Sequence, residues 1–179
     1  MKQTVDAFDY AGQICKAMKK GILLTTCAGE KVNTMTIGWG KIGIEWGKPI
    51  FIAYVRQSRH TRQMLDESGE FTVNIPLGTA DPKALGLCGT KSGRDTDKIA
   101  EAGLTLEPGE AVSVPGIRQF PLTLECKIIY RQEQDLAAIP AAILDRYYPQ
   151  DVDGSHPGSN RDHHIAYYGE IVNSYIITE

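Results

Sequence analysis

The stretch IFIAYVRQSRHTRQML, residues 50–65, decides both the fold class and where a site should lie. Its first six residues are apolar, β-branched or aromatic, which is typical of a strand that is at least half buried. Directly after them come three arginines, a histidine, a serine and a threonine, with no acid before Asp66. The whole chain has a formal net charge of −3. So much positive charge in one turn therefore indicates that the turn faces an anion.

Segments on both sides of this stretch have the same strand character. The predicted strands are residues 22–28, 35–40, 43–46, 50–55, 71–75, 104–107, 111–114, 121–132 and 164–176. Predicted helices at 10–20, 61–68 and 141–148 are short, and residues 80–103 are expected to form helical turns around a glycine-rich loop, with DKIAEA the better helix. Six to eight short strands with few helices predict a mainly β, antiparallel barrel that closes on itself.

Composition limits the class of protein further. The chain has 179 residues, 23% of them charged and 42% hydrophobic, which predicts one globular domain over residues 1–179. A sequence pI near 5.8 argues against nucleic-acid binding, since phosphate backbones require a basic face. The first 20 residues contain neither a signal peptide nor a membrane span, so a cytoplasmic protein is expected. No GxGxxG joins a strand to a helix, which disfavours a Rossmann crevice for a nicotinamide cofactor.

The four cysteines are scattered along the chain, without a CxxC pair. This spacing disfavours a zinc knuckle and a dithiol redox motif, so four free thiols are expected. Cys88 stands between glycines in GLCGTKSG and is the one cysteine with a candidate functional setting.

The turn after residue 55 has the composition of a phosphate site. If Ser58 caps the helix and Thr61 takes its third position, the amides of residues 59–61 point outward. These amides, the two hydroxyls and a guanidinium from Arg56 or Arg59 match the needs of a phosphate monoester. The alternative is a solvated basic face on which the hydroxyl residues only cap the helix.

A second polar stretch, NTMTIGWG at residues 33–40, follows the AGEK turn. Asn33, Thr34 and Thr36 could donate hydrogen bonds to carbonyls of a flat ring, and the two glycines allow the ring to approach the backbone. Trp39 adds an aromatic surface at the edge. The alternative is an ordinary strand with a buried tryptophan.

The order of these motifs resembles the flavin reductase-like, FMN-binding split-barrel family, most nearly its flavoredoxin branch. The motifs are, in chain order, ILLTT, NTMTIGW, a GKP hairpin, IFIAYVRQSRHTRQML, EFTVNIP, CGTKSGRDTDK and HIAYYGEIVNSY. The resemblance covers residues 10–177. It implies a six-stranded Greek-key split barrel that forms a homodimer, with FMN at the subunit interface. The residues it implies for FMN binding are Asn33, Met35, Thr36, Ile37 and Trp39 at the ring, Val55, Arg56, Ser58, Arg59, His60 and Thr61 in the phosphate turn, and Ser92 and Lys98 near the ribityl phosphate.

The resemblance also implies the chemistry. Hydride would pass from NAD(P)H to FMN, and the reduced flavin would pass electrons to oxygen, free flavin, iron or a partner protein. No acid, base or nucleophile is assigned, because the flavin performs the redox step. Two alternatives remain: an FMN-binding electron carrier without nicotinamide turnover, and a structural dimer that has lost its ligand.

The polar segment before the last strand raises the question of a metal site. Its histidines and aspartates are His156, His163, His164, Asp151, Asp153 and Asp162. Adjacent histidines at the start of a strand point to opposite faces, and HPGSN has no fixed ligand spacing. A solvated loop or a dimer contact is therefore favoured, and no metal site is predicted.

Overall fold

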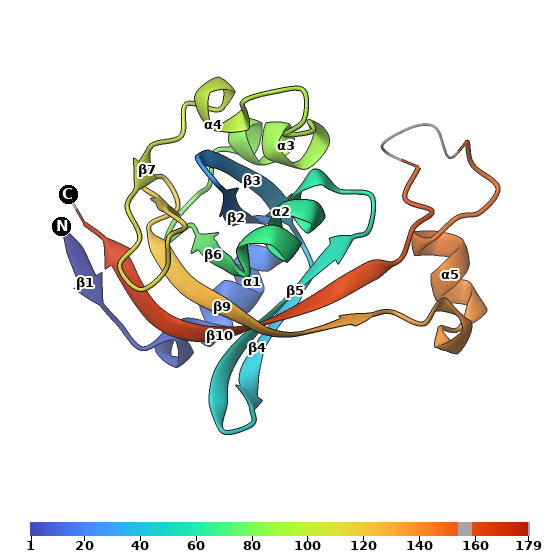
Figure 1. Ribbon diagram of the computed structural model, residues 1–179, viewed down its shortest axis with the longest axis horizontal. Coiled ribbons are helices and arrows are strands. Elements are labelled where there is room, and N and C mark those ends of the chain that lie inside the picture. The colour runs from blue at the N-terminus through green and yellow to red at the C-terminus, as the bar shows by residue number, and fades with distance from the viewer. Residues whose placement is uncertain (154–158, 179) are drawn as a thin grey trace.

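The computed structural model describes residues 1–153 and 159–178 (Figure 1). The strands of its main sheet are β1 (Lys2–Thr4), β2 (Ile22–Ala28), β3 (Lys31–Ile37), β4 (Gly40–Glu45), β5 (Lys48–Arg56), β6 (Glu70–Ile75), β9 (Leu122–Glu133) and β10 (His164–Ile177). A separate two-stranded ribbon pairs β7 (Leu106–Glu107) with β8 (Gly116–Ile117). The helices are η1 (Ala7–Tyr10), α1 (Ala11–Met18), α2 (His60–Ser68), α3 (Pro82–Thr90), α4 (Lys98–Glu101), η2 (Leu136–Ala138) and α5 (Ala141–Tyr147). None of the helices in these described residues is long and apolar enough to span a bilayer.

The main sheet runs in the order β3-β2-β6-β9-β10-β5-β4, with β1 paired to β10. Its pairings are antiparallel, so the predicted mainly β, antiparallel architecture is confirmed. The sheet has eight strands, which is within the six to eight expected from the residues and two more than the six that the resemblance implies. Part of the difference is β1, whose sequence KQT has no apolar alternation and which forms by backbone pairing of Lys2 with Ile177 and Thr4 with Tyr175.

The barrel interior holds one apolar core, built from alternate residues of the strands. Phe51, Val55 and Phe71 are fully buried there, together with Ile14 of α1. Within the described residues no pairing joins β3 to β4, the two ends of the strand order. The C-terminal residue of α1, Met18, lies at this opening, since a Cβ on Gly40 would meet its sulfur at 3.1 Å. The barrel is therefore split, and α1 fills the gap.

Figure 1 shows the helices that frame the site. α3 and α4 lie beside the β2–β3 hairpin, while α5 sits at the far end of the long β9–β10 ribbon, away from the two termini. The chain from α5 returns along residues 159–163 to β10, whose first residue, His164, pairs with Arg56 at the end of β5. The α3–α4 region, the end of β5 and the segment that leads from α5 into β10 thus come together at one end of the barrel.

Three local predictions differ from the structure. The strand expected at residues 35–40 is Lys31–Ile37, so Trp39 lies outside it. The better helix of the middle segment is α3, with nine residues against four in α4. An aspartate caps each of them, but only α3 begins with a proline. Residues 111–114 are a bend rather than a strand, since the buried carboxylate of Glu125 accepts the amides of residues 110 and 111 at 2.7 and 2.8 Å.

Close packing in β10 gives a stability prediction. Gly169 lies at a bulge in the β9–β10 pairing, and a Cβ there would overlap the buried ring of Phe71 and approach Cys126 Cβ at 2.8 Å. Gly169→Ala should lower the free energy of unfolding by about 1–3 kcal/mol, because the core has no space for the methyl group. Gly43→Ala on β4 is the control, since nothing lies within 4 Å of its Cβ position. Urea unfolding of both variants tests this, and an equal effect would contradict it.

Candidate functional site

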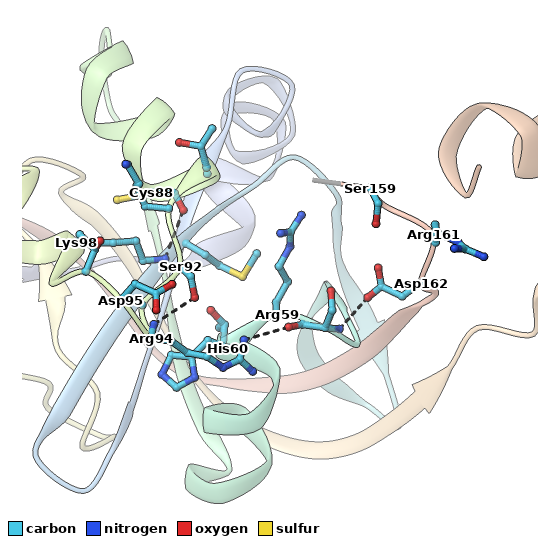
Figure 2. Close-up of a pocket in the computed structure, with 18 residues that line it drawn as sticks. Arg59, His60, Cys88, Ser92, Arg94, Asp95, Lys98, Ser159, Arg161 and Asp162 are labelled. Carbon is cyan, nitrogen blue, oxygen red and sulfur yellow. Dashed lines mark hydrogen bonds between the residues drawn. The ribbon is translucent and has the colours of Figure 1, made fainter. Parts of the chain in front are cut away.

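A cavity of about 830 Å³ lies where these segments converge. It is lined by Met35 of β3, residues 58–61, residues 88–96, Lys98, and Ser159, Arg161 and Asp162. In Figure 2, Cys88, Ser92 and Lys98 of the α3–α4 region lie on one side and Ser159, Arg161 and Asp162 on the other. Arg59 and His60, at the start of α2, lie between these two groups. This volume is in the range of pockets that hold a small organic ligand.

The lining is cationic. It contains five basic side chains, Arg59, Lys91, Arg94, Lys98 and Arg161, and two carboxylates, Asp95 and Asp162, which gives a formal charge of +3 with His60 neutral. A concave site with one sign of charge concentrates the opposite charge. The cavity is therefore suited to an anion, as the basic turn predicts.

The helix after the basic turn begins one residue later than the capping prediction required. Arg59 has extended backbone angles and is the N-cap residue of α2, so Ser58 does not cap the helix. The helix ends at Ser68, and Gly69 follows it with a φ of 68°, in the left-handed region that favours glycine. The amides of His60 and Thr61 are the first of α2 and have no partner inside the helix. Both residues line the cavity.

Arg56, which the resemblance places at the phosphate, is not among the residues that line the cavity. The residue is 9% exposed, and its guanidinium donates to three backbone carbonyls: Asn160 at 2.9 Å, Asp162 at 2.7 Å and Tyr147 at 2.9 Å. Burial, as the largest effect, lowers the pKa of Arg56. The side chain therefore holds the segment between α5 and β10 against the end of β5. Val55, also placed in the phosphate turn by the resemblance, is buried in the barrel core.

Thr61 presents an oriented hydroxyl to the cavity. It is 2% exposed, and its Oγ1 accepts a 2.8 Å hydrogen bond from the Asn33 side-chain amide. A hydroxyl has one proton and two lone pairs, so accepting this bond leaves its proton available to a ligand. Asn33, predicted to bond a ring carbonyl, instead positions Thr61.

His60 has a buried ring nitrogen, Nδ1, without a hydrogen-bond partner among the described residues. Burial chiefly, and then the positive charges of Arg94, Lys98 and Lys31, lower the pKa of His60. The imidazole is therefore neutral at pH 7 and retains hydrogen-bonding capacity at the cavity wall.

Lys98 places a buried amino group at the inner end of the cavity. The residue is 4% exposed, and within the described part of the chain its Nζ donates one weak hydrogen bond, to the Cys88 carbonyl at 3.5 Å. Burial lowers the pKa of Lys98 to about 8; Cys88 opposes the shift, and Arg59 adds to it. A buried lysine so poorly paired is costly unless an anion joins it. Burial also raises the pKa of Cys88, so its thiol is protonated at neutral pH.

The loop between α3 and α4 packs directly on this group of polar side chains. Ser92 lines the cavity, and its hydroxyl accepts the amide of Arg94 at 3.2 Å. A Cβ on Gly93 would collide with the Asn33 side-chain oxygen and reach His60 Cδ2 at 3.2 Å. The glycine therefore lets the loop close the cavity over Asn33 and His60.

Of the remaining residues of NTMTIGW, Met35 lines the cavity and the others do not. Ile37 is 4% exposed and lies in the barrel core. Thr36 lies on the other face of β3 and donates its hydroxyl to the Leu85 carbonyl of α3 at 2.7 Å. Thr34 also faces away, with its hydroxyl bonded to the Leu24 carbonyl and to Thr25.

Trp39 belongs to a neighbouring aromatic cluster rather than to the cavity lining. Its ring centroid lies 4.6 Å from that of His164 and 5.3 Å from that of Tyr147. His164 is buried and shares a 2.9 Å hydrogen bond with the Tyr148 hydroxyl, while burial and the nearby Arg56 charge lower its pKa to about 3. This cluster docks α5 beside the site.

The two adjacent histidines point in different directions, as predicted. His163 Nε2 lies 3.3 Å from a Glu133 carboxylate oxygen, whereas His164 packs on Trp39. No set of three His, Cys, Asp or Glu side chains suited to a metal occurs within residues 1–153 and 159–178. His156 lies outside the described residues.

Sequence reasoning missed part of the lining. Gly89, Thr90, Lys91, Arg94, Thr96, Arg161 and Asp162 were not assigned to the site. Most of them belong to GTKSGRDT, whose density of glycine, hydroxyl and basic residues is itself a signal of an anion-binding loop. Arg161 and Asp162 gave no such signal, because their position depends on how the chain returns from α5.

A comparison with protein families identifies the fold. The flavin reductase like domain matches residues 16–178 of the chain. The chain belongs to this family. A protein of Archaeoglobus fulgidus is 31% identical over 104 residues, which are 58% of each chain. One of Escherichia coli, YddH, is 28% identical over 101 residues, 56% of this chain and 52% of its own. The matches thus span less than two thirds of the relatives' length.

Solved structures show the same flavin reductase-like architecture. Flavoredoxin of Desulfovibrio vulgaris (Miyazaki F) superposes with a TM-score of 0.64 at 24% identity, covering 88% of this chain and 69% of its own. Nitrilotriacetate monooxygenase component B from Bacillus cereus gives a TM-score of 0.65 at 16% identity, over 99% and 79%. At these identities the likeness establishes the fold alone.

Proposed function

We propose that this flavin reductase-like protein binds FMN in the cationic cavity, with the phosphate between the start of α2 and Lys98. The buried, weakly paired amino group of Lys98 carries the proposal, because it faces the same cavity as the first amides of α2. A phosphate dianion would accept from the His60 and Thr61 amides, from the Thr61 hydroxyl and from Lys98. Arg59 and Ser92 line the same region.

The residues fit this ligand on three counts. The Nδ1 atom of His60 is buried and lacks a partner in the described part of the chain, as expected for a wall that meets a polar ligand. Gly93 leaves the loop close to Asn33, where any side chain would intrude. The apolar side chain of Met35 and the backbone of residues 89–91 offer a surface for a flat ring.

Bound FMN would supply the redox chemistry, by accepting a hydride or electrons and passing them on. The protein's part is to hold the phosphate, position the ring and keep water from one of its faces. We assign no acid, base or nucleophile. NAD(P)H is proposed as the hydride donor and free flavin or a redox protein as the acceptor, on the strength of family membership.

A homodimer is also part of the proposal. Large apolar side chains stand exposed on the β4–β5 hairpin and on β9: Ile44 is 73% exposed, Trp46 58%, and Ile129 and Tyr130 43% each. The ring of Trp46 lies 6.0 Å from that of Tyr130 and 6.1 Å from that of Tyr168. A contiguous apolar surface of this kind is typical of a protein interface. Light scattering on the purified protein measures the association.

Titration of the purified protein with FMN and with riboflavin tests the proposed function. We expect FMN to bind at least about 100-fold more tightly, since the phosphate adds several charge-assisted hydrogen bonds of about 1.5–3 kcal/mol each. Equal affinities would refute the phosphate site. Anaerobic addition of NADH or NADPH to the FMN complex should bleach its visible absorption. Bleaching by dithionite alone would favour the electron carrier over the reductase.

A further inference from the structure

The end of the basic turn already holds a carboxylate. The Ser58 amide donates a 2.8 Å hydrogen bond to Asp162 Oδ2, drawn as a dashed line in Figure 2. The Ser58 side chain also helps to lower the pKa of this carboxyl group. Ser58 belongs to the segment expected to receive a phosphate. An anion of the protein itself is thus held at Ser58, two residues before the first of the amides that are proposed to bind the phosphate.

This carboxylate is ionised. Burial alone would raise the pKa of Asp162, but the hydrogen bonds from Ser58 and the charge of Arg56 outweigh burial and lower it. Among the described residues, the other acid that lines the cavity is Asp95, which is exposed. Asp162 is therefore the negative charge that a bound phosphate would meet at Ser58.

The backbone of Asp162 is fixed independently of its side chain. Its carbonyl accepts a 2.7 Å hydrogen bond from Arg56 Nη1, and the neighbouring Asn160 carbonyl accepts another at 2.9 Å from the same nitrogen. Removing the negative charge at residue 162 should thus leave the cavity wall in place. An asparagine could still accept the Ser58 amide through its side-chain oxygen.

We propose that Asp162 is an affinity- and specificity-determining residue, whose carboxylate competes with the flavin phosphate for the Ser58 end of the turn. The inference rests on the proposed FMN site. A fixed like charge beside the phosphate weakens binding of the dianion and leaves a flavin without phosphate unaffected. The flavin is consequently held loosely enough to exchange, as a protein that passes reduced flavin to others requires.

The test compares Asp162→Asn with the wild-type protein in fluorescence titrations with FMN and riboflavin. We expect the Kd for FMN to fall by about 10-fold, as for the removal of one unfavourable charge contact, with riboflavin unchanged within about twofold. Asp95→Asn is the matched control and should change the Kd for FMN by less than about threefold, because exposed charges are screened. Asp162→Ala, which keeps the carbonyl bound to Arg56, provides a second variant should the first not fold.

The outcomes separate the two proposals. If the wild-type protein prefers FMN to riboflavin and Asp162→Asn binds FMN with equal or lower affinity, the inference is wrong and the proposed function stands. If neither protein prefers FMN to riboflavin, the proposed function fails, and the inference fails with it. Tighter FMN binding by Asp162→Asn and Asp162→Ala, but not by Asp95→Asn, supports it.

Discussion

Replacing Lys98 with methionine should weaken FMN binding by about 10- to 100-fold while leaving the fold intact. The loss corresponds to one charge-assisted hydrogen bond of about 1.5–3 kcal/mol, at about 1.4 kcal/mol for each factor of ten. Methionine has a similar length and no charge, so it fills the same buried space beside Cys88. Riboflavin affinity should not change, because riboflavin has no phosphate.

The same substitution should not destabilise the ligand-free protein at pH 7. The pKa of Lys98 falls from 10.5 to about 8 on folding, so the unfolded chain binds more protons between these pH values. The charged lysine therefore opposes folding most below pH 8, and its cost fades as the pH rises through 10.5. Relative to the wild type, Lys98→Met should gain stability at pH 7 and lose that advantage by pH 10.5.

The affinity for FMN should change with pH in the opposite direction to the stability of the wild-type protein. Phosphate binding requires the ammonium form, so FMN affinity of the wild-type protein should fall as the pH rises above about 8, and Lys98→Met should lack this decline. Lys91→Met is the control, since Lys91 is an exposed lysine of the same cavity lining. Its loss should stay below about threefold, because exposed charge pairs contribute about 0–1 kcal/mol. Equal losses for the two variants would mean that Lys98 does not contact the phosphate.

Local sequence signals predicted the elements around the site well. The bounds of β2 agree with the expected strand residue for residue, and α2 begins within one residue of its expected start. Gly69 ends α2 in the left-handed region, as a glycine after a short amphipathic run indicates. The bounds of such elements depend on residues that are close together in the chain, so they can be predicted from a single sequence.

The assignments that needed long-range information were less reliable. Alternation along β3 separates the side chains of Asn33 and Thr36, but it does not tell which face the cavity occupies. On β6 and β9, Thr72, Asn74 and Glu125 alternate with apolar residues, a pattern typical of a strand with one face in solvent, yet all three are fully buried. Their side chains bond to the backbone of residues 110–117. Asn74 donates to Thr72 and accepts the amide of Ile117 at 3.0 Å. What covers a strand face cannot be derived from the strand's own pattern.

Arg56 is the clearest case of this limit. Its position in a basic turn suggested a phosphate ligand, but the carbonyls that it binds lie 91 to 106 residues away in the chain. A buried carbonyl left without a donor costs about 1–3 kcal/mol, and Arg56 satisfies three. The guanidinium also lies 5.1 Å from the centre of the Tyr148 ring. In the structure, Arg56 donates hydrogen bonds to the backbone carbonyls of a distant loop, and this is a structural role that does not involve a ligand's charge.

Arg56→Met should therefore lower the free energy of unfolding by about 3–5 kcal/mol, the range for breaking a buried, multiply bonded charged group. Arg56→Lys should recover little of this, because an ammonium cannot reach carbonyls on both sides as the planar guanidinium does. Arg118→Lys is the control: its guanidinium is 47% exposed and pairs with Glu107 at 2.6 Å, so a change below about 1 kcal/mol is expected. Urea unfolding measures all three variants. The opposite outcome would be an Arg56→Lys variant with wild-type stability and greatly weakened FMN binding. That result would mean that Arg56 contacts the phosphate and contributes little to the stability of the fold.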